Sequence, residues 1–235
     1  MSIWDRRILA VVPARGGSEG IWLKNLREVG GRSLVALAGD IAAAVIGIDR
    51  RIVSTDLEKI AAAARDAGLD APFLRPPSLS GPAISDFMVL HHALREMESM
   101  DECVYDVVVM LQPTSPNRTV HHVGDAIHML IGGNYDSVWT VSRADLRYHP
   151  LKQLRLHGGN LEYYDKRGAG IIARQQLEPL YVRNGAAYVV TRDCLYRQRN
   201  IHGERCGAFV IDDELANIDS ELDLKWAEFL MENNQ

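Results

Sequence analysis

Residues 8–26 read ILAVVPARGGSEGIWLKNL, and this stretch decides how the chain folds. Its first part, 8–12, is a run of aliphatic side chains, which is typical of a strand buried on both faces of a sheet. Pro13 ends the run, and a loop with three glycines follows. Glycine lets the backbone approach a ligand closely, and the exposed N–H groups of such a loop can bind phosphate oxygens. Because Arg15 and Lys24 add positive charge, the stretch predicts a nucleotide site at the carboxyl end of the first strand.

The loop differs from both common nucleotide-binding fingerprints. No Gly-Lys-Ser/Thr closes it, so it is not a Walker A loop, and its glycines do not follow the G-x-G-x-x-G spacing. A glycine pair after a strand is also compatible with a simple turn. The assignment therefore depends on motifs elsewhere in the chain.

Composition narrows the class of protein. The chain has 235 residues, long for one domain but not clearly two, and 47% hydrophobic residues, which is sufficient for a large core. A net charge of −5 argues against nucleic-acid binding. The three cysteines lack metal-ligand spacing, so we expect reduced thiols. No apolar run is long enough for a membrane span and no signal-peptide pattern is seen, which predicts a cytoplasmic protein without membrane contacts.

Strand and helix patterns alternate along most of the chain, which predicts an α/β fold with parallel strands. We expect Thr55 or Asp56 to begin the second helix, although contact with a ligand is an alternative for both. Ser33 is the expected cap of the first helix, and Gly68 is expected to end the second. In chain order the predicted elements are strand 8–12, helix 33–46, strand 51–56, helix 57–67, helix 85–97, strand 106–111, helix 120–130, strand 136–142, strand 208–211 and a helix after 220.

The pattern changes at about residues 145–182. Short strand-like segments separated by Gly and Asn turns indicate hairpins rather than further strand–helix units. A segment that protrudes from the α/β body needs a partner surface to bury its apolar side chains. A lid folded onto its own domain is one possible partner, and a second subunit is the other.

Several motifs occur in an order that resembles one known family, the acylneuraminate (CMP-sialic acid or nonulosonic acid) cytidylyltransferases. The loop at 14–25 is similar to A-R-G-G-S-K-G-I-x-x-K-N, and 111–118 is similar to L-Q-P-T-S-P-x-R. The further matches are V-S-T-D at 53–56, L-R-P at 74–76, R-Q-x-L at 174–177, N-G-A-x-Y at 184–188 and D-I-D-x-x-x-D-x-x-x-A-E at 217–228. Glu19 stands where the family has lysine, and Asn217 where it has aspartate.

The resemblance implies a Rossmann-like three-layer α/β/α nucleotidyltransferase fold, formed by residues 1–235 as one domain. In this family the region corresponding to 145–182 is a dimerisation arm that reaches into the sugar pocket of the neighbouring subunit. We therefore expect a homodimer.

The resemblance also implies the site residues. Those expected in catalysis are Arg15, Lys24 and Asp219. Those expected to bind the nucleotide are Ala14, Arg15, Gly16, Gly17, Ser18, Lys24, Asn25, Arg75 and Asp86. Those expected to bind the sugar are Gln112, Thr114, Ser115, Arg174 and Asn184, with Arg174 shaped to hold a carboxylate. Asp219 and Asn217 are the expected Mg²⁺ ligands, Asn217 without a charge. Simple turns are the alternatives for 114–116 and for 184–185.

The implied reaction joins CTP to a 3-deoxy-2-keto sugar acid and releases pyrophosphate, with Mg²⁺ as cofactor. The product would be a CMP-sugar for nonulosonic acid, lipopolysaccharide or capsule biosynthesis. The sugar could equally be Kdo, legionaminic acid or pseudaminic acid. The alternative is a binding protein and not an enzyme: a catalytically weak homologue that binds nucleotide sugars.

Overall fold

The strand predicted to organise the chain, β1 (Ile8–Pro13), lies between β4 (Arg50–Ser54) and β5 (Val107–Met110) near one edge of a six-stranded sheet. The computed structural model describes residues 5–18 and 20–233. The other strands are β6 (Ser137–Arg143), β9 (Tyr181–Thr191) and β10 (Cys206–Val210), in the order β10-β6-β9-β5-β1-β4. Only β9 runs antiparallel to its neighbours in this sheet, so the predicted mostly parallel α/β fold is confirmed.

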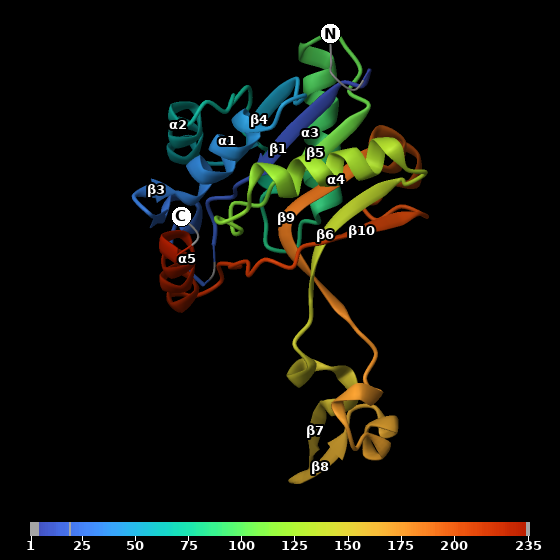
Figure 1. Ribbon diagram of the computed structural model, residues 1–235. Helices are drawn as coiled ribbons and strands as arrows, with labels where there is room; N and C mark the ends of the chain where they lie inside the picture. The colour runs from blue at the N-terminus through green and yellow to red at the C-terminus, as the bar shows by residue number, and fades with distance from the viewer. Residues whose placement is uncertain (1–4, 19, 234–235) are drawn as a thin grey trace.

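Helices cover both faces of the sheet (Figure 1). Their bounds are α1 Leu34–Ala44, α2 Glu58–Asp66, α3 Asp86–Met100, α4 Val120–Gly132 and α5 Glu221–Asn233. Alternate residues of β1 serve the two faces: Ile8 packs in the cluster formed with α1, α2 and α4, whereas Leu9 packs in the cluster formed with α3. The sheet is therefore the middle of three layers.

The cap predicted for α1 is present, and α3 has a cap of the same kind. The Ser33 hydroxyl accepts a hydrogen bond from the N–H of Ala36 at 3.3 Å, and Ser85 accepts one from Met88 at 3.4 Å. Gly68 follows α2 with a φ of 77°, a conformation that L side chains rarely adopt.

The cap predicted for α2 is wrong. Leu57 precedes the helix, and no side chain caps it. Thr55 Oγ1 accepts from the N–H of Leu57 at 3.2 Å, within the turn before the helix. The Asp56 carboxylate accepts instead from the N–H of Gly16 at 2.8 Å, because parallel pairing of β1 and β4 brings their carboxyl ends together. Asp56 thus holds the glycine loop in place.

The C-terminal helix α5 packs beside the glycine loop and not on the sheet. It shares a cluster with Ile21 and with Val29 of a small hairpin, β2 (Glu28–Val29) and β3 (Arg32–Ser33). Ile218, just before α5, is fully buried in the same cluster. This packing carries Asp219 to the loop across almost the whole length of the chain.

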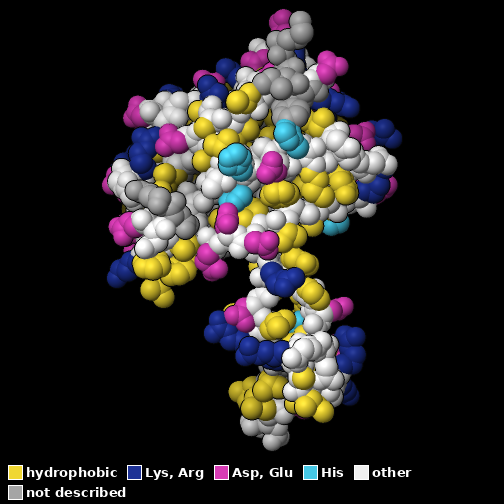
Figure 2. Space-filling model, viewed as in Figure 1, with side chains coloured by type: hydrophobic (Ala, Val, Ile, Leu, Met, Phe, Trp, Pro, Cys, Tyr) yellow, Lys and Arg dark blue, Asp and Glu magenta, His cyan; other side chains and the backbone are white. Residues whose placement is uncertain are grey.

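The segment between β6 and β9 projects from the body as an arm (Figure 1). It contains an antiparallel hairpin, β7 (Leu154–His157) and β8 (Asn160–Tyr163), and several turns of 3₁₀ helix. Hydrophobic and basic side chains cover its surface in Figure 2, and Leu156, Leu161 and Ile172 are 70%, 68% and 94% exposed. The arm therefore buries little of its apolar surface within the chain.

Two further observations concern the chain as a whole. Cys103, Cys194 and Cys206 form no disulfide. Among residues 5–18 and 20–233, none of the helices combines the length and the hydropathy that a membrane crossing requires.

Candidate active site

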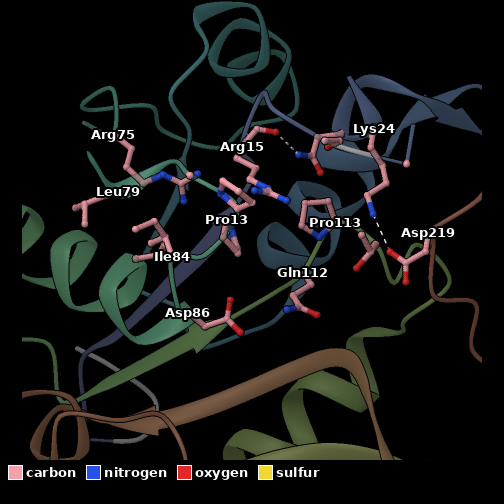
Figure 3. A pocket seen from close by; sticks show the side chains of 17 residues that line it. Pro13, Arg15, Lys24, Arg75, Leu79, Ile84, Asp86, Gln112, Pro113 and Asp219 are labelled. Atoms are coloured by element: carbon pink, nitrogen blue, oxygen red, sulfur yellow. Dashed lines mark hydrogen bonds and ion pairs between the residues drawn. The ribbon is translucent and has the colours of Figure 1, made fainter. Parts of the chain in front are cut away.

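A cavity of about 540 Å³ opens at the carboxyl ends of β1 and β5, where the sequence predicts a nucleotide site (Figure 3). Residues from four separate parts of the chain line it: the glycine loop, the segment 75–89, the loop after β5, and Asp219. The predicted site residues that line it are Arg15, Ser18, Lys24, Asn25, Arg75, Asp86, Gln112, Thr114 and Asp219. Three are cations and two are carboxylates, which suits an anionic ligand.

The glycine loop is fixed by contacts within the protein. Asp56 accepts from the N–H of Gly16, and the Asn25 amide donates to the carbonyl of Arg15 at 2.9 Å. Asn25 is 6% exposed, so its side chain shapes the loop. Leu23 has a φ of 48°, which turns the chain sharply before Lys24.

Lys24 and Asp219 face each other across one side of the cavity (Figure 3). The Lys24 ammonium lies 3.0 Å from the Asp219 carboxylate and donates to the carbonyl of Ile218 at 2.7 Å. The carboxylate is 74% exposed, whereas the Lys24 side chain is 18% exposed. Such a wet ion pair contributes at most about 1 kcal/mol, so an incoming phosphate can replace the carboxylate on Lys24 at little cost.

A buried arginine and a half-buried aspartate occupy the opposite wall. Arg75 is 4% exposed, and burial lowers the pKa of its guanidinium. Asp86, in the first turn of α3, accepts no hydrogen bond from any described residue. Burial raises the pKa of the Asp86 carboxyl, and the charge of Arg183 partly opposes this shift. Ionisable groups that are desolvated in a cleft are typical of binding sites.

Replacing Asp86 with asparagine is expected to raise the melting temperature at pH 7 and to weaken nucleotide binding. The pKa of Asp86 is raised in the folded state, so its carboxyl does not destabilise the fold below its unfolded pKa of about 4, where both states are protonated. The destabilisation develops as the pH rises through the folded pKa. Thermal unfolding of the parent and the variant at pH 4 and pH 7 measures this difference.

The matched control is Asp125→Asn, which changes an exposed carboxylate on α4 outside the cavity. Its melting temperature should follow that of the parent at both pH values. An Asp86→Asn protein that is less stable than the parent at pH 7 would contradict the prediction.

A buried arginine, Arg118, holds the loop after β5 through hydrogen bonds to its carbonyl groups. Arg118 is 4% exposed and donates to the carbonyl of Ser115 at 3.0 Å and to that of Gln112. It has no acidic partner among the described residues, and burial lowers its pKa. The arginine stands in the motif at 111–118, but the sequence analysis gave it no role. The prolines at 113 and 116 signal a rigid turn, but no sequence pattern showed which side chain would satisfy its carbonyls.

Other predicted site residues lie outside the cavity lining. Ser115 and Asn184 lie behind the wall, where Ser115 Oγ donates to the Asn184 carbonyl at 2.6 Å. Asn184 is 7% exposed, and its side chain is bonded to Thr140, Ser142 and Ala186. Ala14 is fully buried. Gly16, Gly17 and Asn217 do not line the cavity, Arg174 lies on the arm, and Glu19 is outside the described residues.

Residues 217–219 alternate between exposed and buried positions. Ile218 is buried, and Asn217 and Asp219 are exposed on the opposite side of the backbone, as alternation predicts. Of the two, only Asp219 lines the cavity.

An α/β sheet with a basic glycine loop and an opposed carboxylate at its carboxyl edge defines the class of protein as a nucleotidyltransferase. A family model described as cytidylyltransferase matches residues 9–234. The chain belongs to this family, in the branch of acylneuraminate and other nonulosonic acid cytidylyltransferases.

Two relatives and one solved structure are similar to nearly the whole chain. The chain is 30% identical to a CMP-N,N'-diacetyllegionaminic acid synthase of Legionella pneumophila, over 97% of this chain and 98% of the relative. It is 28% identical to the post-translational flagellin modification protein B of Campylobacter coli, over 95% and 94% of the two chains. A solved CMP:2-keto-3-deoxy-manno-octonic acid synthetase, complexed with CTP, has the same fold, with a TM-score of 0.72 at 17% identity, covering 97% of this chain and 100% of the other.

Proposed function

We propose that the protein transfers a cytidylyl group from CTP to a nonulosonic acid, with Mg²⁺, and releases pyrophosphate. The observation that carries this proposal is a cavity that is lined by three cations, Arg15, Lys24 and Arg75, and also by the carboxylate of Asp219. The names of the relatives, one of them a CMP-N,N'-diacetyllegionaminic acid synthase, support a sugar acid as the acceptor.

The residues of the cavity fit a magnesium ion that the nucleotide brings with it. No group of three or more His, Cys, Asp or Glu side chains that could hold a metal exists in the described part of the chain. Mg²⁺ in nucleotide enzymes, however, is commonly bound by one or two carboxylates together with substrate phosphates. Asp219 supplies such a carboxylate. The ion would neutralise phosphate charge and polarise the attacked phosphorus.

The protein's own groups then position the reactants. Arg15 and Lys24 hold the triphosphate, and Lys24 exchanges its contact with Asp219 for one with phosphate. Gln112 and Thr114 orient the sugar acid at the neighbouring part of the wall. The anomeric oxygen of the sugar attacks the α-phosphorus and loses its proton as the bond to the β-phosphate breaks. Such a transfer depends mainly on alignment and charge neutralisation.

We further propose that the enzyme is a homodimer in which the arm completes the sugar site of the other subunit. Arg174 is exposed on the arm, which projects away from the body that contains the cavity (Figure 1). The exposed Leu156 and Leu161 of the arm hairpin need a cover, and a second copy of the chain supplies one. Sedimentation of the parent and of a Leu156→Asp, Leu161→Asp variant tests this proposal.

The activity is tested with a panel of 2-keto sugar acids, including legionaminic, pseudaminic, N-acylneuraminic and Kdo substrates. Each is incubated with CTP, UTP or GTP and Mg²⁺, and pyrophosphate release is followed. We expect release with CTP and at least one nine-carbon acid, together with a CMP-sugar, and none after chelation of the metal. Binding of CTP without any release would favour a nucleotide-sugar-binding protein.

A further inference from the structure

Asp219 lies on an irregular segment that crosses the body between β10 and α5. We call residues 211–220 the strap; in Figure 1 it runs across the front of the body to α5. The strap has no regular secondary structure, and of its side chains only Ile211, Ala216 and Ile218 are buried. Since a segment with so little packing does not fix its own geometry, other contacts must set the place of Asp219.

Polar contacts from the loop after β5 hold the strap at three points. The Asn117 side chain donates to the carbonyl of Glu214 at 2.8 Å and accepts from the N–H of Ala216 at 3.0 Å. Next to it, the N–H of Ile218 donates to the carbonyl of Thr114 at 2.9 Å. The amide of Asn117 thus pairs with the strap through both a donor and an acceptor, as a neighbouring strand would.

The glycine loop holds the strap from the other side. A Cβ on Gly20 would lie 2.7 Å from the carbonyl oxygen of Asp219, so the two backbones touch. Lys24 donates to the carbonyl of Ile218 and to the carboxylate of Asp219. Asp219 therefore sits between two loops, and Asn117 supplies the side-chain bonds on one side.

We propose that Asn117 is a positioning residue that fixes Asp219 in the cavity. Asn117 does not line the cavity, and it occupies the unspecified position of the P-T-S-P-x-R motif. Asn117 acts through the strap, because its side chain holds the backbone of Glu214 and Ala216. These bonds keep the N–H of Ile218 paired with the carbonyl of Thr114. Asp219, the next residue, then stays opposite Lys24. The inference rests on the role of Asp219 in the proposed function.

A double-mutant cycle tests the proposal. Asn117→Ala is expected to lower kcat for pyrophosphate release by about 10- to 100-fold, as is usual for residues that orient a metal-binding side chain, with little change in the KM for CTP. In an Asp219→Asn background the same change should lower kcat less than about twofold. Asn117 acts only through the Asp219 carboxylate, so its effect is lost once that carboxylate is gone. If Asn117→Ala lowered kcat by the same factor in the parent and in Asp219→Asn, the proposal would be overturned.

Amide hydrogen exchange gives a readout that does not need activity. Loss of Asn117 frees the N–H of Ala216 directly, so the informative amide is that of Ile218, which is bonded to Thr114 and not to Asn117. We expect Ile218 to exchange faster in Asn117→Ala. Unchanged protection at Ile218 would mean that Asn117 does not position the residues next to Asp219.

The matched control is Asn200→Ala. Asn200 also uses its side-chain amide to hold backbone, accepting from His202 and donating to Gln198, each at 2.9 Å, but outside the cavity. It should lose stability without the fall in kcat. If Asn117→Ala does not fold, Asn117→Asp takes its place in the cycle; it keeps the acceptor for Ala216 and replaces the bond to Glu214 with a repulsive contact between two oxygens. An Asp219→Asn protein with full activity would instead refute the role of Asp219 in the proposed function and leave the reaction itself intact, and hydrogen exchange would still decide the role of Asn117.

Discussion

Replacing Asp219 with alanine is expected to abolish CTP-dependent pyrophosphate release, with a loss on the order of 10³-fold or more. Asp219 is the acidic group on the cation-rich side of the cavity, and it lies 3.0 Å from Lys24. Without it, Mg²⁺ has no protein carboxylate beside the phosphates, and Lys24 loses the partner that holds it in the cavity. Pyrophosphate release in saturating CTP and sugar acid is the measurement.

The fold should not suffer from this change. The Asp219 carboxylate is 74% exposed, and exposed ion pairs contribute only about 0–1 kcal/mol to stability. The melting temperature of Asp219→Ala should therefore stay close to that of the parent. The matched control is Glu214→Ala, which removes an exposed carboxylate from the same strap outside the cavity and should retain activity. If Asp219→Ala turned over like the parent, the metal assignment would be wrong.

The sequence predicted five of the six strands of the sheet because their signals are local, but it did not predict the antiparallel strand β9 (Tyr181–Thr191). The aliphatic run at 8–12 and the polar residues that follow 106–111 identify two strands and the edge at which they end. Parallel pairing then brings Arg15 and Gln112 to one cavity.

The tertiary contacts that refine the site were not predictable in the same way. Asp56 was expected to cap α2, but it binds the N–H of Gly16 in a different loop. Asn184 matched a motif, and its side chain is bonded to Thr140 and Ser142 on the neighbouring strand. Each of these bonds joins residues about 40 positions apart. A residue type shows what a side chain can bind, whereas the partner depends on which strands lie side by side.

Replacing Arg174 with lysine is expected to raise the KM for the sugar acid by about 10- to 100-fold, the worth of a hydrogen bond to a charged group, and to change the KM for CTP much less. The guanidinium can hold a planar carboxylate through two parallel hydrogen bonds, and an ammonium cannot. Steady-state kinetics with each substrate varied in turn measures the two constants. Equal increases in both would argue against a role in holding the sugar carboxylate.

The position of Arg174 on the arm makes a stronger test possible. In a dimer whose arms complete each other's sites, a subunit with Asp219→Ala still offers an intact arm, and a subunit with Arg174→Ala still offers an intact cavity. Each mixed dimer then contains one complete site, so co-expression of the two inactive chains should restore about a quarter of the parent activity if subunits pair at random. If each arm served its own subunit, every site in the mixed dimer would lack one of the two residues, and no activity would return. Recovery therefore requires that Arg174 act across the subunit interface, whereas its absence, with mixed dimers shown to form, would place the arm over the cavity of its own chain.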